Sequence, residues 1–399
     1  MTASPVLDLG FLGFEQGAHL LVQRALRDLP PGAELGVTGL DAALPVHLRA
    51  WARKQGHGVR ESTDGLGVRA WVIRGRADLD RWAGAVRAGG PRPDGILARA
   101  DPSWGLAARG ALVEPGGPAP RFDLVDRDLV WADIAPSLYA SAVAAQWKPD
   151  EAIAWDVGFA LPEEIERAVV QVMTYLVENE QAALVIPARL LARIHPHFRE
   201  VQQLLAVQAA DEARHVEVFT RRALLRGGEL GTSSVSGRES LATLLTEPDF
   251  SLASFLLSVL GEGSFLNLLS FLDRHAPDPV TRQVTRMARQ DEARHVAFGV
   301  AHLQHQAAVD PALRGRLRGA VERRHDALAD TAGLNQDVFD ALVVLAAGEW
   351  TPEAIRRGHE AVRLLQQEMH EGRQHRLIRL GFPADEAAEL SSLHTRNFM

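Results

Sequence analysis

The sequence predicts a mainly α protein, a four-helix bundle with extra helices, preceded by a small α+β domain. Helical periodicity dominates from Pro162 to the C-terminus. Two hairpins of that region each contain the letters DEARH, at 211–215 and again at 291–295. Residues 1–76 instead alternate short strand-like and helix-like runs. These three observations set the fold class.

Three segments are predicted along the chain. In the first, 1–76, the order of runs is that of a β-α-β-α-β-β domain. Its strand-like runs are 6–12, 34–38, 59–62 and 68–73, and its helical runs are 19–29 and 44–55. The second, 77–128, is rich in Gly and Pro and is predicted to be a linker. The third, 129–399, is predicted to be helical, with a C-terminal extension that includes a helix over 352–380.

Composition limits the function classes. The net charge of −8 argues against a nucleic-acid partner, because phosphate binding needs a basic surface. The chain has no cysteine, which excludes disulfides, thiolate metal sites, iron–sulfur clusters and cysteine nucleophiles. Any metal must therefore be held by His, Asp and Glu. The N-terminal residues lack the features of a signal peptide, so a cytoplasmic location is expected.

One apolar stretch approaches the length of a membrane span. It runs from Ser251 to Leu272 and contains several serines, two glycines, Asn267 and Glu262. This polar content favours a core helix of the bundle over a membrane helix. No membrane partner is expected.

The first hairpin places two glutamates opposite each other. Its turn centres near Pro196, and Glu180 and Glu212 lie sixteen residues on either side. In an antiparallel hairpin both would sit about 24 Å down their helices, at 1.5 Å per residue. Glu212 also begins a Glu-x-x-His pair with His215, and residues three apart share a helix face.

The second hairpin repeats the arrangement around Pro277. Glu262 and Glu292 lie fifteen residues on either side of it, and Glu292 begins a Glu-x-x-His pair with His295. Glu262 is the only ionisable side chain between 251 and 272, and a buried carboxylate is very costly unless it is paired or binds a cation. The two hairpins together predict a site for two metal ions.

The predicted metal ligands are Glu180, Glu212, His215, Glu262, Glu292 and His295. Glu180 shares the apolar stripe of its helix, whereas Glu178 would share a face with Gln171 and Thr174 and is the weaker candidate. Four carboxylates balance the charge of two divalent ions. A duplication kept only for packing is the competing explanation, although packing does not need so many charged side chains. His195, His197 and His275 lie at the turns and are expected to be solvated.

The remaining polar residues of the two DEARH copies are predicted to support the ligands. Asp211 and Asp291 could accept the second N–H of the ligand histidines and so fix their tautomer. Arg214 and Arg294 could pair with those aspartates. The tryptophans of the segment 131–155, together with Tyr175, are expected to pack in the core or cap the bundle, rather than to form an electron path.

The repeated Asp-Glu-x-Arg-His resembles the ribonucleotide-reductase-like branch of the ferritin-like di-iron carboxylate superfamily, over roughly residues 130–310. The resemblance implies two iron ions that react with dioxygen in their ferrous state, and the same ligands would accept manganese or a mixed pair. Three positions depart from individual members. Phe219 replaces a radical-forming tyrosine, Ala288 replaces an extra histidine ligand of arylamine N-oxygenases, and Leu266 replaces a threonine of hydroxylating monooxygenases.

The N-terminal segment resembles the TusA-type sulfur carriers, most clearly in GLDAALPVHLRAWARKQGHGV. The Cys-Pro of that family is replaced by Phe14-Glu15, so no persulfide can form. The segment is interpreted as a degenerate docking or dimerisation module, with substrate gating as the alternative.

The predicted function is that of a di-iron oxygenase or oxidase that uses dioxygen to hydroxylate, desaturate or N-oxygenate a small organic substrate. The alternatives are a ferroxidase or peroxide-scavenging protein without an organic substrate, and a scaffold in which the ions only stabilise the bundle. No flavin, nicotinamide or phosphate-loop motif occurs, so electrons are expected from a separate reductase or from the substrate. A homodimer is expected.

Overall fold

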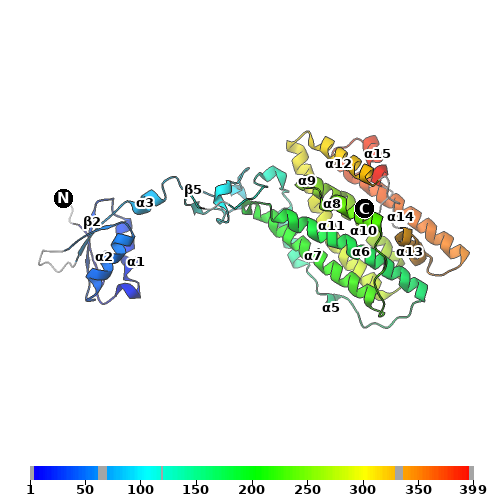
Figure 1. Cartoon of the computed structure of the whole chain (residues 1–399), viewed down its shortest axis with the longest axis horizontal. Coiled ribbons are helices and arrows are strands. Elements are labelled where there is room, and N and C mark those ends of the chain that lie inside the picture. Colours follow the sequence, from blue (N-terminus) through cyan, green and yellow to red (C-terminus); the bar gives the residue numbers. More distant parts are fainter. Residues whose placement is uncertain (1–3, 62–69, 118–119, 329–335, 395–399) are drawn as a thin grey trace. The chain divides into compact units, whose positions relative to one another are not determined.

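The computed structural model describes residues 4–61, 70–117, 120–328 and 336–394. The chain divides into two compact units (Figure 1). The smaller unit comprises Met1–Gly90 and Gly110–Pro118, and the larger comprises Pro91–Arg109 and Ala119–Met399. The predicted mainly α fold, with a small α+β part at the N-terminus, is confirmed.

The smaller unit contains a mixed sheet with the strand order β1-β2-β4-β3 among its described residues. The strands are β1 (Val6–Asp8), β2 (Glu34–Thr38), β3 (Gly58–Glu61) and β4 (Ala70–Ile73). β1 and β2 are parallel, and β4 is antiparallel to both β2 and β3. The helices α1 (Ala18–Arg27) and α2 (Leu44–Lys54) follow β1 and β2, which is the predicted order of elements. The predicted strand ends at 62 and at 68–69 lie outside the described residues.

The core of this unit forms between the sheet and its two helices. Val22 and Leu26 of α1 and Leu48 of α2 are buried against Leu35 and Val72 of the sheet. Buried and half-buried positions alternate in β4, as expected for a strand with one face on the core. Three short elements complete the unit: α3 (Ala77–Arg81), β5 (Val86–Arg87) and β6 (Leu112–Val113).

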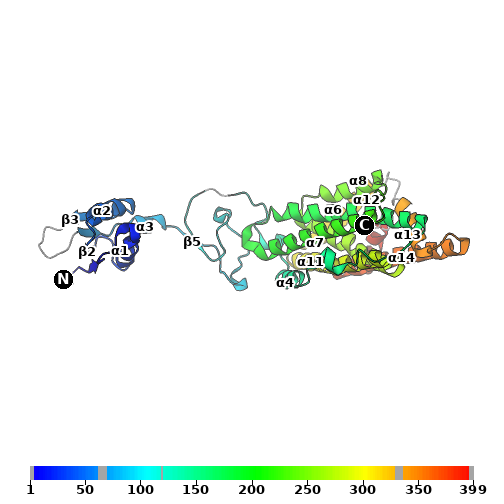
Figure 2. The ribbon, with the colours of Figure 1, turned by 90° about the horizontal axis from the view of Figure 1, so that it is seen from below.

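The larger unit is built around four long helical segments (Figures 1 and 2). They are α6 (Glu163–Leu191), α7 (Arg199–Leu224), the continuous run of α9 (Phe250–Ser254), η6 (Phe255–Glu262) and α10 (Gly263–His275), and α11 (Pro279–Val309). α6 packs against α7, α10 packs against α11, and α7 packs against α11. The predicted pair of hairpins therefore forms a four-helix bundle.

Local sequence explains where these helices begin and end. α6 starts after Pro162 with three glutamates in its first turn, which complement the helix dipole. The run after α7 ends at Gly227, whose φ of +75° suits a residue without a side chain. α11 starts at Pro279 after Asp278, whose carboxylate accepts a hydrogen bond from the Thr281 backbone N–H at 2.8 Å.

The segment η6 is a π-helix, which the sequence analysis did not predict. It lies in the apolar stretch Phe250–His275, which is long and apolar enough to cross a membrane. In the structure 83% of its most apolar window is buried. The expectation of a core helix is therefore confirmed for this segment.

Shorter helices surround the bundle. α4 (Ala135–Ala144) packs against both α7 and α11, and α13 packs against α6. α14 packs against α10 and ends before Gly381, as predicted. The remaining bounds are α5 (Pro149–Ala152), α8 (Val235–Leu245), α12 (Leu313–Ala327), α13 (Gln336–Ala347), α14 (Pro352–Arg379) and α15 (Ala384–His394).

Candidate metal centre

Four carboxylates and two imidazoles meet inside the bundle, one glutamate from α6, one from η6 and a Glu-x-x-His from each of α7 and α11. They form two overlapping groups, and within each group the ligand atoms all lie within 4.8 Å of one another. One group is Glu180, Glu212, His215 and Glu292, and the other is Glu212, Glu262, Glu292 and His295. The structure thus brings together all six residues predicted as ligands, with Glu212 and Glu292 common to both groups.

All six side chains are buried, and none is more than 5% exposed. The 3.6-residue helical period explains this burial, because each Glu-x-x-His places its two members on the same inward face. Glu178 lies outside both groups, in agreement with its lower rank in the sequence analysis. The ferritin-like arrangement of a glutamate on two helices and a Glu-x-x-His on the other two is therefore present.

Both histidines direct Nδ1 toward the carboxylates. Nδ1 of His215 lies 3.3 Å from Glu212 and 3.6 Å from Glu180. Nδ1 of His295 lies 2.9 Å from Oε1 of Glu212 and 3.4 Å from Glu292. Neither Nδ1 of His295 nor Oε1 of Glu212 makes a hydrogen bond, so their closeness is not that of an aligned donor and acceptor. This orientation suits two atoms that both bind a third partner, such as a metal ion.

Unpaired oxygens provide the test of whether the residues fit metal ions. Buried carboxylate oxygens without a hydrogen-bond partner occur on each of the four glutamates: Glu180, Glu212, Glu262 and Glu292. Leaving so many polar atoms unsatisfied in a core is costly. Divalent cations would satisfy them at once, and carboxylate oxygen with imidazole nitrogen is a suitable donor set for iron or manganese. The residues present fit a dinuclear metal centre.

The shifts in pKa reflect the negative charge that is concentrated at this site. Burial, together with the negative charges of Glu212 and Glu292, raises the pKa of Glu180 well above its usual value. Burial and the charge of Glu292 also raise the pKa of Glu262. Burial opposes ionisation of Glu212, but the charge of His295 and the hydrogen bond from His215 lower its pKa.

The histidines respond to the carboxylates in the opposite sense. Burial alone would lower the pKa of His215, but the charge of Glu180 and the hydrogen bond to Asp291 raise it well above its usual value. Glu212 and Glu292 raise the pKa of His295 in the same way, against the effect of burial. Protons and divalent cations would therefore compete for these six side chains, and metal binding should release protons.

The two aspartates of the DEARH copies hold the histidines across the bundle. Nε2 of His215 lies 3.1 Å from Asp291, and Nε2 of His295 lies 3.4 Å from Asp211. Each aspartate therefore serves the histidine of the other helix, a crossed pairing that the sequence analysis did not specify. A carboxylate acceptor on Nε2 keeps the hydrogen there and leaves Nδ1 available for a metal.

Arg214 and Arg294 close this network between α7 and α11. Each arginine pairs with the aspartate of its own helix, and each also reaches the other, at 3.1 Å from Arg214 to Asp291 and 3.3 Å from Arg294 to Asp211. Burial opposes ionisation of Asp291, but the hydrogen bond and charge of His215, with hydrogen bonds from Trp147 and Arg294, hold its pKa below the usual value. The predicted pairing of arginines with aspartates is confirmed.

Three further residues contact the network and were missed by the sequence analysis. Gln208 donates to Glu262 at 3.1 Å, and its place one turn before Glu212 was a detectable signal. Gln146 donates to Asp211, and the indole N–H of Trp147 donates to Asp291, each at 2.8 Å. Both precede the bundle in sequence, so no local spacing could have placed them here.

The turn histidines require a correction. His195 and His197 were expected to be solvated, but they are 1% and 3% exposed. Nε2 of His197 accepts the backbone N–H of Leu97 at 2.9 Å, and Nδ1 of His195 accepts the N–H of His197 at 3.1 Å. Burial lowers the pKa of His197 to about 4, in line with a neutral ring. His275 is half-buried and packs against Phe271.

No known family model and no curated protein matches this chain. Among solved structures, it is similar to an R2-like ligand-binding oxidase from Sulfolobus acidocaldarius, with 15% identity, a TM-score of 0.42, and coverage of 60% of this chain and 91% of that one. It is similar to an R2-like ligand-binding oxidase with an aerobically reconstituted Mn/Fe cofactor, with 20% identity, a TM-score of 0.42, and coverage of 67% and 95%. It is also similar to a protein from Synechococcus with aldehyde deformylating oxidase activity, with 18% identity, a TM-score of 0.41, and coverage of 57% and 96%.

Proposed function

We propose that this protein is an oxidoreductase that binds two iron ions, or manganese and iron, and uses dioxygen to oxidise a small organic substrate. The observation that carries the proposal is the cluster of six buried ligand side chains with unpaired oxygens on all four glutamates. A bundle does not need such a cluster for its own stability, because buried charges without partners destabilise it.

The bound ions would supply electrons for the reduction of dioxygen and so the oxidising power for the substrate. The chain's own residues provide the rest. Glu212 and Glu292 would be shared between the ions, while Glu180 with His215 and Glu262 with His295 would each complete one of them. The four carboxylates balance two divalent charges. The aspartates hold the imidazoles in one orientation, and burial of the cluster excludes water from the reacting centre.

Electrons for repeated turnover would come from a separate electron-transfer protein or from the substrate. The ferroxidase alternative differs in this respect, because ferrous iron itself would be the substrate and no organic product would form. Incorporation of oxygen-18 from labelled dioxygen into a small molecule separates oxygenation from iron oxidation. Desaturation would instead appear as the loss of two hydrogens from the organic molecule.

The direct test is anaerobic reconstitution of the full chain with ferrous iron, with manganese, and with both, followed by exposure to dioxygen. We expect two metal ions per chain and dioxygen consumption that depends on the bound metal. Glu212→Ala should abolish both, whereas Glu217→Ala, an exposed glutamate on the same helix, should change neither. Absence of metal uptake would end the proposal. Tight binding without any reaction with dioxygen would leave only the structural role of the ions.

A further inference from the structure

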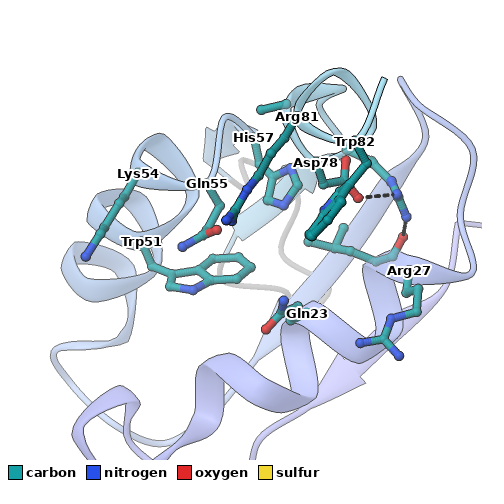
Figure 3. Close-up of a pocket in the computed structure, with 12 residues that line it drawn as sticks. Gln23, Arg27, Trp51, Lys54, Gln55, His57, Asp78, Arg81 and Trp82 are labelled. Atoms are coloured by element: carbon teal, nitrogen blue, oxygen red, sulfur yellow. Dashed lines mark hydrogen bonds and ion pairs between the residues drawn. The ribbon is translucent and has the colours of Figure 1, made fainter. Parts of the chain in front are cut away.

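The smaller unit contains a cavity of about 320 Å³ between α1, α2 and the segment that begins with α3 (Figure 3). Its lining includes Trp51, His57 and Trp82, together with four cationic side chains. The volume is at the lower end of the range of small-molecule sites, enough for one or two fused rings. All lining residues belong to the smaller unit, so the cavity is separate from the metal centre.

Two glycines allow the α3 segment to form one wall of this cavity. Gly56 follows α2 with a φ of +73°, and an added Cβ there would lie 2.4 Å from Cβ of Ala77. A Cβ on Gly75 would lie 1.7 Å from the backbone oxygen of Gly56. The backbone N–H of Gly75 also donates to Nδ1 of His57 at 3.1 Å. This close backbone contact brings Arg81 and Trp82 over the end of α2.

Neither indole is fully buried. Trp51 is half-buried and held between Phe14 and His57, at ring distances of 6.1 and 5.6 Å. Trp82 is 40% exposed, lies outside the core cluster of the described residues, and has the Arg81 guanidinium over its ring, 5.3 Å from the centroid. Figure 3 shows the two indoles on either side of the space, with His57 between them. Exposing a large aromatic surface is unfavourable in water, and a planar ligand between the rings would cover it.

The charge around the cavity is positive, although the chain as a whole has a net charge of −8. Arg74 is committed to the fold, because it donates to the Leu26 carbonyl and to Asp78, which is the lining carboxylate. Arg81 pairs with Glu114 at an exposed position. Arg27 and Lys54 have no hydrogen bond or ion pair within the described part of the chain. These two cations are available to a ligand.

His57 adds a neutral polar group rather than another charge. Its Nδ1 accepts the Gly75 N–H, so this nitrogen carries no hydrogen. Nε2 then carries the hydrogen of the neutral ring and can donate it. The lining thus offers two aromatic faces, one neutral donor and two unpaired cations.

We propose that this cavity binds a small planar aromatic molecule that bears a carboxylate or a phosphate. The ring would stack between Trp51 and Trp82, and the anionic group would pair with Arg27 on one side of the space or with Lys54 on the other (Figure 3). A ligand without a ring would leave the indoles exposed, and a cation would be repelled. The two sources of the anion, an aromatic carboxylic acid or a nucleotide, share this chemistry and are distinguished by the probes below.

The test is calorimetric titration of the full chain with 2-naphthoate and, separately, with adenosine monophosphate. The comparison probes are cyclohexanecarboxylate, which lacks the aromatic ring, and 2-naphthylmethylammonium, which reverses the charge. We expect saturable binding of at least one aromatic anion, with weaker binding of both comparison probes. Binding should also weaken with added salt, because the two cations are exposed to solvent.

Variants locate the binding. The double variant Arg27→Gln/Lys54→Gln should bind the preferred anion about tenfold more weakly, since one lost charge-assisted contact contributes roughly 1.5 kcal/mol. The matched control is Arg24→Gln/Arg53→Gln, which removes two exposed cations from the same helices outside the cavity. Trp82→Ala should also weaken binding about tenfold by loss of stacking.

Circular dichroism of each variant reports whether it remains folded. Equal binding of aromatic anion and aromatic cation would overturn the proposal. Equal loss in the Arg24/Arg53 control would do the same, because it would show a general charge effect. The metal centre is not involved in these measurements, so their outcome is independent of the proposed oxidoreductase function.

Discussion

Each hairpin of the bundle contributes one lone glutamate and one Glu-x-x-His pair, but the two sets lie in different surroundings. Glu180 lies in the regular helix α6, whereas its counterpart Glu262 ends the π-helix η6. Glu262 accepts a hydrogen bond from Gln208, and the residue at the corresponding place before Glu292 is Ala288. The two halves thus agree at the metal ligands and diverge one turn away.

The divergence continues after the ligands. Seven residues beyond Glu212 is the buried Phe219, and seven beyond Glu292 is Gly299. A Cβ at Gly299 would lie 2.5 Å from Cβ of Ser258 in the π-helix. The π-helix therefore lies where only a glycine can face it. The proposed metal binding would require the six ligands in both halves, while close packing decides the residues that surround them.

The largest effect is expected from substitution of the two glutamates that both ligand groups share. Glu212 and Glu292 belong to both groups of ligand atoms, whereas Glu180 and Glu262 belong to one each. Glu212→Ala or Glu292→Ala should therefore remove both metal ions, and Glu180→Ala or Glu262→Ala should remove one. Metal content per chain after reconstitution and desalting measures this. If a variant of a shared glutamate still held one ion at full occupancy, the ligands would not be shared.

The second prediction concerns the residue seven positions beyond each ligand histidine, where the two halves differ in charge. Seven residues beyond His215 is Arg222, which is paired with Glu166 and Asp278. Seven beyond His295 is His302, whose Nδ1 must donate to the carbonyl of Trp131 at 3.0 Å, because a carbonyl only accepts. Its Nε2 then accepts the hydroxyl of Ser251 at 2.9 Å, so the buried ring is neutral.

Burial lowers the pKa of His302 from 6.5 to about 4. Because the folded pKa is below the unfolded one, stability is lost as pH falls from 6.5 toward 4. The loss should reach about 3 kcal/mol at the acidic end. Denaturant unfolding of chelator-treated protein, compared with His302→Gln, measures it. The variant should be less stable at neutral pH but depend less on pH, and parallel pH profiles would contradict the assignment.

The third prediction removes the space that the π-helix needs. Gly299→Ala should destabilise the protein by about 1–3 kcal/mol, as expected for overpacking of a core. It should also weaken the group that contains Glu262 more than the group that contains Glu180. Gly315→Ala is the matched control, since it lies in a helix with nothing within 4 Å of the added Cβ. Thermal unfolding and metal content report both effects, and a neutral Gly299→Ala would show that the π-helix can shift.

The sequence predicted that these six side chains would meet, because their placement follows from local helical geometry. Spacing of three on a helix and equal distances from a turn depend only on helical rise and period. The π-helix did not upset this arithmetic, because Glu262 still comes to lie among the other ligands. Its presence was not predictable, since it depends on contacts with Gly299 and with Arg376, which donates to the Val259 carbonyl at 2.7 Å.

The features that escaped prediction all depend on contacts between distant segments. The crossed pairing of aspartates and histidines follows from how α7 lies against α11, which no single hairpin specifies. His197 is buried because Leu97, a hundred residues earlier, covers the turn. Trp147 reaches Asp291 across a comparable separation. Sequence spacing alone carries no information about such contacts.

The smallest effect on metal binding is expected from substitution of the two aspartates in the crossed network. Loss of a carboxylate behind a ligand histidine typically weakens metal binding about 10- to 100-fold. Asp291 lies 3.1 Å from Nε2 of His215. Asp211 lies 3.4 Å from Nε2 of His295. Asp291→Asn should therefore weaken metal binding more than Asp211→Asn, with chelator competition as the measurement.

This last comparison is decided by which of the two metal ions is bound more weakly in each variant. With crossed pairing, Asp291→Asn frees His215, which belongs to the group containing Glu180, although Asp291 lies on the helix of the other group. Combining Asp291→Asn with Glu180→Ala should then add little to the loss caused by Glu180→Ala, because both changes affect the same ion. Combining it with Glu262→Ala should remove one ion and weaken the other. The reverse result would mean that each aspartate acts on the histidine of its own helix, and the two halves would be independent rather than interlocked.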